Sequence, residues 1–360
     1  MPSLAFGLFR SHYLNDNETI NITGKAFNDI KESYTGGSVD MIIPQGYNIY
    51  HYDINSLYPF AMKMFESPVR YIKYFEGDID LTSYKPFGFF YAEIQSPNNL
   101  NIPILQIHHK NRTISPLGKF KDWFFSEELR NALDNFWYKV EILKGYTFDH
   151  KVIFNNYVND LYNLRLTYDK SHPMNYIAKL LMNSLYGRFG LNVLLSEFTI
   201  INKTELDRFV DYNEILELID LDDKFLMGFI ANDKLDGSLI SNLVNDVKSN
   251  IAISSAITAY SRMVLADIKK YCLDNGIKLF YFYTDSVFTS KPLPDHFISR
   301  AIEKWKLEAF CKEAITSNDD LKFNVAIASI LLIFTRALPD SNWDNPNWQS
   351  GTLPIKLKAL

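Results

Sequence analysis

Apolar and polar residues alternate from Ile49 to Ile54, which is the pattern of a half-buried β-strand. Its aromatic and β-branched side chains suit a pleated surface. Directly afterwards, Ser56 is a candidate N-cap and Pro59 fits the first turn of a helix. Asp53 is therefore predicted where a strand gives way to a helix, a suitable place for a metal or a phosphate. Taken alone, a buried Asp that only caps the helix is the simpler interpretation.

A second strand pattern runs from Lys278 to Thr289 and is interrupted by Thr-Asp-Ser, which predicts a hairpin with Asp285 at or near its turn. A long helix precedes it, with Ser249 as a candidate N-cap and Asn275-Gly276 as its stop. Asp-Ser is common in turns. Paired with Asp53, however, Asp285 would make a metal site, because two divalent ions about 3.5–4 Å apart need bridging carboxylates. We expect the two carboxylates within about 4–6 Å of each other.

Residues 155–190 carry the period of two helices joined by residues 169–173. In the first helix, Arg165 lies beside an apolar stripe. In the second, one side presents Lys179, Asn183, Tyr186 and Gly187, opposite a leucine-rich side. A cation can hold a triphosphate, an aromatic ring can pack on a base, and a glycine lets a base pair approach the backbone. An ordinary solvated helix face is the equally simple alternative.

The other segments are less informative. Residues 73–150 read as strands and turns followed by a helix, which indicates an α+β fold. Residues 191–248 look less regular, and Asp220, Asp222 and Asp223 are expected in a solvated loop, because a calcium loop would need a Gly and a closing Glu. The pair Gly36-Gly37 follows Tyr34, and is a turn or a place where another backbone comes close.

The amino-acid composition indicates a globular protein but does not indicate its function. The chain has 360 residues, is 47% hydrophobic and carries a net charge of −5, so it can bury a large core. Its two cysteines offer neither a disulfide framework nor zinc spacing. We expect no membrane association, since no continuous apolar stretch has the length of a membrane span. The charge neither supports nor excludes a polynucleotide partner, because a local basic channel can outweigh the total.

The motifs together resemble family B DNA polymerases, and specifically the protein-primed polymerases of linear plasmids in fungal and plant mitochondria. The likeness extends from the N-terminus to about Ala314 and rests on three stretches that are similar to polymerase motifs A, B and C. These are Asp-Ile-Asn-Ser-Leu-Tyr-Pro at 53–59, Lys-x-x-x-Asn-Ser-x-Tyr-Gly at 179–187, and Tyr-Thr-Asp-Ser at 283–286. Tyr-Thr-Gly-Gly at 34–37 is similar to the short motif that joins the exonuclease and polymerase domains of that family.

The resemblance implies an α+β fold, in which an antiparallel palm sheet with helices carries a helical-hairpin fingers subdomain. It divides the chain into six segments. They are an entry segment at 1–49, a first palm part at 50–150, fingers at 151–190, an insertion at 191–248, a second palm part at 249–316 and a divergent tail at 317–360.

It also implies roles for individual residues. Asp53 and Asp285 would be catalytic ligands of two Mg²⁺ ions, with Ile54 at the same metal site. Tyr58 would stack under the sugar and exclude a ribose 2′-hydroxyl. The other implied nucleotide-binding residues are Lys179 with Arg165 at the triphosphate, Asn183, and Tyr186 on the nascent base pair. The implied DNA-binding residues are Tyr34, Gly36, Gly37 and Gly187.

Three departures from the family pattern stand out. Tyr283 occupies the place of an aspartate in motif C. Because only about thirty residues precede Tyr34, we expect no proofreading exonuclease domain in this chain. After Glu308, the expected Lys-x-Tyr element and thumb are missing, and an apolar run from Val325 to Phe334 follows instead. We expect the polymerase core of a longer protein.

The leading hypothesis is a DNA-directed DNA polymerase that replicates a linear mitochondrial plasmid or genome and is located in mitochondria. Its partners would be template and primer DNA and deoxynucleoside triphosphates, with a terminal protein as a candidate primer. One alternative is an inactive relic that at most binds single-stranded DNA. Another alternative is a metal-dependent nuclease built on Asp53 and Asp285. A nuclease would give no role to the polar side of the helix that carries Lys179.

Overall fold

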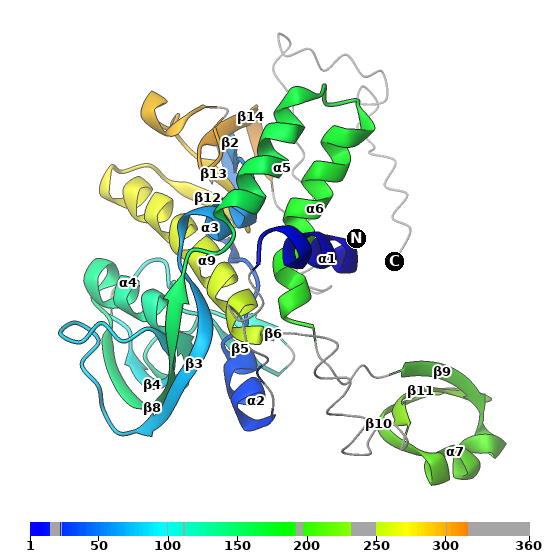
Figure 1. The fold of residues 1–360 in the computed structure, drawn as a ribbon. Helices are drawn as coiled ribbons and strands as arrows, with labels where there is room; N and C mark the ends of the chain where they lie inside the picture. The colour runs from blue at the N-terminus through cyan, green and yellow to red at the C-terminus, as the bar shows by residue number, and fades with distance from the viewer. Residues whose placement is uncertain are drawn as a thin grey trace. The chain divides into compact units, whose positions relative to one another are not determined.

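The computed structural model describes residues 1–14, 22, 24–98, 100–110, 112–191, 197–231, 250–299 and 301–315. The apolar run at 325–334 and the tail at 317–360 lie outside these residues. The chain divides into two compact units, of which the first comprises Met1–Gly36 and Tyr58–Met263, and the second Gly37–Leu57 and Val264–Leu360. Antiparallel sheets with helices make up the fold (Figure 1), which confirms the predicted α+β class.

The second unit contains an antiparallel sheet of five strands in the order β1-β12-β13-β2-β14. Its strands are β1 (Val39–Met41), β2 (Gln45–Ile54), β12 (Leu279–Tyr283), β13 (Ser286–Thr289) and β14 (Trp305–Ile315). The predicted strand therefore exists as the end of β2, and the predicted hairpin as β12 and β13 with Thr284-Asp285 at the turn. Tyr52, Phe282 and Val287 are fully buried in this unit.

The first unit contains a four-stranded sheet in the order β3-β8-β4-β7. Its strands are β3 (Ser67–Glu76), β4 (Gly88–Gln95), β7 (Lys119–Phe125) and β8 (Lys139–Lys151), and α4 (Ser126–Phe136) follows β7. Two short strands, β5 (Ile107–His109) and β6 (Arg112–Ile114), pair separately. Phe89, Phe90, Phe124 and Phe125 are buried on β4 and β7, so aromatic packing stabilises this sheet.

Two antiparallel helices form the predicted helical hairpin (Figure 1): α5 (Asn155–Thr167) and α6 (Pro173–Phe189). The hydroxyl of Tyr157 donates to the Leu181 carbonyl at 2.9 Å. The side-chain amide of Asn175 donates to the carbonyls of Arg165 and Tyr168, which satisfies the end of α5. His172 caps α6 by accepting the Met174 amide.

Three more helices belong to this part of the chain: α1 (Pro2–His12), α2 (Gly24–Glu32) and α3 (Leu57–Met64). Phe9 of α1 packs on Phe154, Tyr157 and Phe189, which ties α1 to the helical hairpin. The helix predicted after motif A is α3. Ser56 before it has a φ of 58°, which differs from the extended backbone of a usual N-cap.

The long helix α9 (Ile251–Asp274) follows the pattern predicted from the sequence. Ser249 lies outside the described residues, and the side chain of Asn250 accepts the Ala252 amide at 3.1 Å as the N-terminal cap. Among the described residues, α9 is the one helix long and apolar enough to cross a membrane, but 83% of its apolar window is buried within the protein. Core helices of globular proteins have the same property.

Residues 197–231 are more regular than predicted. They form β9 (Glu197–Asn202), a 3-10 turn η1 (Lys203–Glu205), α7 (Leu206–Tyr212), β10 (Asn213–Leu221) and β11 (Lys224–Ala231). The strands pair in the order β10-β11-β9. Asp220 is not in a loop but in β10, where it forms an ion pair with Lys203, while Asp222 and Asp223 make the turn to β11. A register shift between Ile215 and Glu217 breaks the alternation that would have revealed β10.

Candidate active site

The register of the five-stranded sheet brings Asp53 and Asp285 together. β13 pairs with β2 so that Ser286 lies opposite Asp53, and Asp285 directly precedes Ser286. The backbone of Ile54 donates its N–H to the Asp285 carbonyl at 2.8 Å. Although about 230 residues separate the two aspartates in the sequence, Asp53 near the end of β2 and Asp285 at the turn before β13 are brought next to each other by this pairing. Both side chains are half-buried.

The charges at this point repel each other. Burial, together with the nearby carboxylate of Asp285, raises the pKa of Asp53 to about 6, while a hydrogen bond donated by Ser286 Oγ at 3.0 Å opposes the rise. A carboxyl group that resists ionising beside a second carboxylate gains most from a cation placed near it. The pair therefore has the electrostatics of an acidic metal site or of a carboxylate dyad.

Three neighbours of Asp53 were not predicted from the sequence. Ser286 donates to its carboxylate, Lys306 lies opposite it on β14, and Glu308 raises its pKa through space. Lys306 and Glu308 also form an ion pair. Because Glu308 lies at a register shift between Leu307 and Ala309, alternation alone could not place it. The sequence feature that could have indicated these neighbours is the spacing of Lys306 and Glu308, because residues two apart in a strand lie on the same face.

The donor set fits magnesium. Carboxylate oxygens are hard ligands, and Mg²⁺ is commonly held by one or two carboxylates while water and substrate phosphates complete the octahedron. Across the described residues, no group of three His, Cys, Asp or Glu side chains could hold an ion. The protein would thus supply Asp53 and Asp285. Ile54 follows Asp53, lies opposite Trp305 of β14 and donates its backbone N–H to the Asp285 carbonyl.

Tyr283 ends β12 beside this pair. It lies opposite Ser286 on one side and Val39 on the other, and 36% of its surface is exposed. A phenol carries no charge at neutral pH. The resemblance implies an aspartate at this position, so Tyr283 replaces a carboxylate that would add negative charge to the site.

We expect Asp53→Asn to stabilise the metal-free protein at neutral pH. Folding raises the pKa of Asp53 above its ordinary value of 3.8 to about 6. The Asp53 side chain therefore contributes its full stability to the fold below pH 3.8, and this contribution is lost as the pH rises through about 6. Asn carries no charge at either pH. Urea midpoints of the wild type and Asp53→Asn should coincide near pH 4, and the variant should be higher at pH 7.5.

Asp80→Asn is the matched control of opposite sign. Hydrogen bonds from Ser83 and Thr82 lower the pKa of exposed Asp80, so this substitution should lower the midpoint at pH 7.5. A midpoint for Asp53→Asn at or below that of the wild type at pH 7.5 would contradict the raised pKa of Asp53.

Two tyrosines from different elements of the first unit stack on each other. Tyr58 of α3 and Tyr186 of α6 have ring centroids 4.5 Å apart and planes inclined by 18°. Burial raises the pKa of Tyr186, with smaller contributions from Tyr58 and Tyr34. The rings that the family resemblance assigns to the sugar and to the base pair thus form one aromatic platform.

The polar side of α6 lies outside the core, as predicted. Lys179, Asn183 and Gly187 are exposed, whereas Leu181 and Leu185 are buried. A side chain at position 187 would meet no atom within 4 Å, so the space beside this glycine is open. The side chain of Arg165 on α5 is half-buried.

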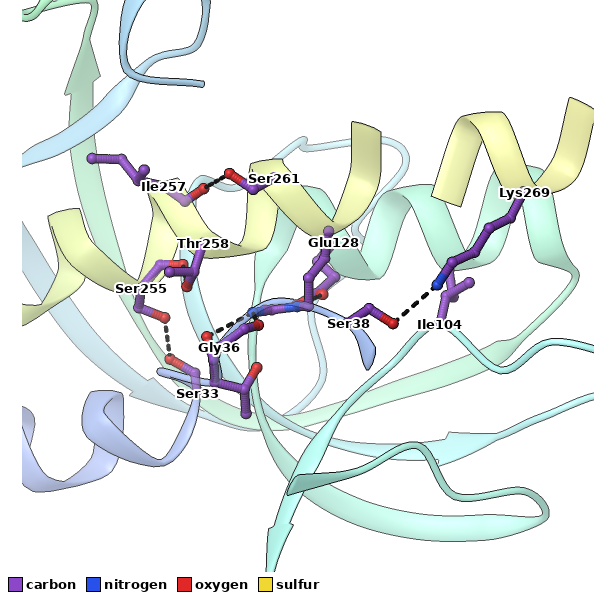
Figure 2. Close-up of polar contacts among 12 residues, drawn as sticks. Ser33, Gly36, Ser38, Ile104, Glu128, Ser255, Ile257, Thr258, Ser261 and Lys269 are labelled. Atoms are coloured by element: carbon purple, nitrogen blue, oxygen red, sulfur yellow. Dashed lines mark hydrogen bonds and ion pairs between the residues drawn. The ribbon is translucent and has the colours of Figure 1, made fainter. Parts of the chain in front are cut away.

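The segment from Tyr34 to Gly36 is held by its own unit. His108 Nε2 lies 3.3 Å from the Tyr34 carbonyl. Arg262 of α9 donates to the carbonyls of Thr35 and Gly36 at 2.9 and 3.0 Å. Figure 2 shows Gly36 accepting this contact, and Ser33 bonded to Ser255 one residue before Tyr34. Gly36 itself is exposed, with no atom within 4 Å of where a side chain would begin.

Comparison with known families identifies one family model over most of the chain. Residues 1–272 match the model described as "DNA polymerase type B, organellar and viral". A "Probable DNA polymerase" of Neurospora intermedia is 37% identical over 326 residues, which cover 87% of this chain and 32% of that protein. A "Probable DNA polymerase" of Ascobolus immersus is 34% identical over 321 residues, covering 88% of this chain and 26% of that protein.

Solved structures of Phi29 DNA polymerase share the fold. One, a complex with primer-template DNA and incoming nucleotide substrates, has a TM-score of 0.65 and 18% sequence identity, and the match covers 87% of this chain and 53% of that one. The chain thus spans about half of that structure, and a third or less of the first two relatives.

Proposed function

Because the chain belongs to the type B DNA polymerases of organelles and viruses, we propose that it forms the core of a DNA-directed DNA polymerase and carries out template-directed nucleotidyl transfer. The observation that carries this proposal is the pairing of Asp53 with the Asp285 hairpin. The polar face of α6 supports it, since a nuclease built on the same carboxylates gives that face no role.

The chain's own residues would divide the work as follows. Asp53 and Asp285 would hold two Mg²⁺ ions, which would supply Lewis-acid chemistry for the primer 3′-hydroxyl and for the pyrophosphate leaving group. Ser286 orients the Asp53 carboxylate through its hydrogen bond. The backbone bond between Ile54 and Asp285 fixes the turn relative to β2. These contacts preorganise the two acids before an ion arrives.

The nucleotide would be held by residues of the first unit. Lys179 and Arg165 supply positive charge for the triphosphate, with Asn183 on the same face of α6. The platform of Tyr58 and Tyr186 packs against the sugar and the nascent base pair. Gly187, Tyr34, Gly36 and Gly37 would line the path of the DNA.

We extend the proposal to the partners of the whole protein. The Phi29 polymerase complex contains primer-template DNA and incoming nucleotides, and we infer the same two substrates for this chain. We further propose replication of a linear plasmid or genome in mitochondria, with a terminal protein as primer. One observation favours a second function: Tyr283 removes a charge from the metal site, which suits an inactive relic that binds single-stranded DNA.

The nucleotide site can be tested by equilibrium binding, without relying on catalysis. Loss of a charge-assisted contact costs about 1.5–3 kcal/mol, so Lys179→Ala should raise the Kd for a fluorescent deoxynucleoside triphosphate with Mg²⁺ by about tenfold or more. Lys170→Ala, an exposed lysine just before α6, should leave the Kd unchanged. If the wild type and Lys179→Ala bind the nucleotide with the same Kd, Lys179 does not bind the triphosphate.

A further inference from the structure

A lysine is buried in the second unit against Phe282 of β12. Lys269 of α9 is 1% exposed. Its ammonium group donates to Ser38 Oγ at 2.9 Å, as Figure 2 shows, and lies 3.3 Å from the centre of the Phe282 ring. Burying a lysine is costly unless its donors are satisfied. This lysine is satisfied by one hydroxyl, one ring face and the charge of Asp40.

The contacts of Lys269 converge on the strands that carry the hairpin. Ser38 immediately precedes β1, and β1 pairs with β12 so that Asp40 lies opposite Phe282 and Val39 opposite Tyr283. Burial lowers the pKa of Lys269 to about 7 and raises that of Asp40. The ammonium group is thus enclosed by the last residues before the turn and by the strand beside them.

Ser38 connects the lysine to the turn itself. Its carbonyl accepts the backbone N–H of Thr284 at 2.9 Å, while its hydroxyl accepts from Lys269. Thr284 has a φ of 48°, in a region that β-branched residues seldom occupy and that surrounding contacts must maintain. Asp285 is the next residue, so the conformation of Thr284 sets the direction in which that carboxylate leaves the sheet.

Gly37 completes this support. A side chain at position 37 would begin 2.6 Å from Thr284 Oγ1 and 2.7 Å from its Cγ2. The glycine is therefore needed for Thr284 to pack against the 37–38 backbone. Gly37 therefore has a structural role of its own at the turn, whereas Gly36 is exposed and has no atom within 4 Å of where a side chain would begin.

We propose that Lys269, through Ser38, is a positioning residue that holds the Thr284-Asp285 turn in the conformation required for metal binding. This inference rests on the proposed function of Asp53 and Asp285 as metal ligands. Nothing in the proposal requires Lys269 to touch metal, nucleotide or DNA. Groups that orient metal ligands without touching the ion typically change the affinity for the metal when they are removed.

The primary test is Mn²⁺ binding to the full chain by calorimetry, since Mn²⁺ accepts the same oxygen ligands as Mg²⁺. Lys269→Met keeps the apolar stem and removes the ammonium group. We expect it to raise the Kd for Mn²⁺ about tenfold. Lys270→Met changes the next residue, whose ammonium group binds Asp274 instead, and should leave the Kd unaltered. An unchanged Kd for folded Lys269→Met overturns the proposal.

A milder variant covers the case in which Lys269→Met does not fold. Ser38→Ala removes one hydroxyl and leaves the backbone bond to Thr284 in place. It should weaken Mn²⁺ binding in the same direction while the chain remains folded at the assay temperature. If Ser38→Ala loses stability but binds Mn²⁺ like the wild type, Lys269 supports only the fold and the proposal is wrong.

Hydrogen exchange tests the turn without any metal. In Ser38→Ala and Lys269→Met, the Thr284 amide should exchange faster than in the wild type, while the Tyr50 amide in β2 keeps its protection. Unchanged exchange at Thr284 overturns the positioning role. Asp285→Asn tests the metal site separately from the positioning role of Lys269. If Asp285→Asn binds Mn²⁺ like the wild type, the proposed metal site is wrong. Faster exchange at Thr284 in Lys269→Met would still show that Lys269 controls the turn.

Discussion

Tyr283→Asp is expected to raise Mg²⁺-dependent primer extension by this chain about 100-fold or more, from a wild-type rate near background. Tyr283 lies opposite Ser286, next to Asp285 in the hairpin. One unit charge about 4 Å from a cation is worth about 4 kcal/mol at a surface-like dielectric before screening, and each 1.36 kcal/mol changes a rate tenfold. Extension of a labelled primer on a defined template measures the effect.

The control for this gain is Asp285→Asn in the Tyr283→Asp background, which should abolish whatever extension is restored. Tyr283→Asn provides a second control, because it removes the ring without adding charge and should give little gain. Robust extension by the wild-type chain would contradict a site weakened by Tyr283. No gain from Tyr283→Asp would favour the DNA-binding relic over the enzyme.

Glu128→Ala is expected to destabilise the protein by about 3–5 kcal/mol, because it leaves the guanidinium of Arg262 buried without its counter-charge. The side chains of Glu128 and Arg262 are 5% and 3% exposed, and two hydrogen bonds of 2.7 and 2.9 Å join them. Arg262 also holds the carbonyls of Thr35 and Gly36. The loss should therefore loosen that segment as well as lower the free energy of unfolding.

The matched control is Asp149→Ala, which breaks an ion pair with Arg70 between side chains that are 40% and 70% exposed. Exposed pairs contribute about 1 kcal/mol or less. Urea unfolding of both variants at pH 7 gives the comparison. If Glu128→Ala costs no more than Asp149→Ala, the buried pair has no special role in stability.

Local patterns predicted the elements that carry the site. Alternation identified the strand that carries Asp53, and the interrupted aromatic run identified the hairpin at Asp285. The 3.6-residue period identified α5 and α6, including the exposed side of α6 with Lys179. Each of these features depends on neighbours within a few residues in the chain, which is the range that periodicity describes.

Contacts between distant segments could not be predicted in this way. The register that places Ser286 opposite Asp53 joins residues 233 positions apart, and the effect of Glu308 on Asp53 depends on a register shift in β14. Lys269 is a cation on a helix, which a sequence pattern assigns to solvent, yet it is buried against Ser38 and Phe282. Tertiary packing determines whether such a side chain is buried, and the residue type alone does not reveal this burial.

Anomalous scattering from crystals of the chain soaked with Mn²⁺ tests most directly whether Asp53 and Asp285 form one metal site. The result we predict is a peak within coordination distance of both carboxylates, about 2–2.5 Å from an oxygen of each, which disappears in Asp285→Asn. A bound ion that touches neither carboxylate, or a peak that persists in Asp285→Asn, would contradict the claim.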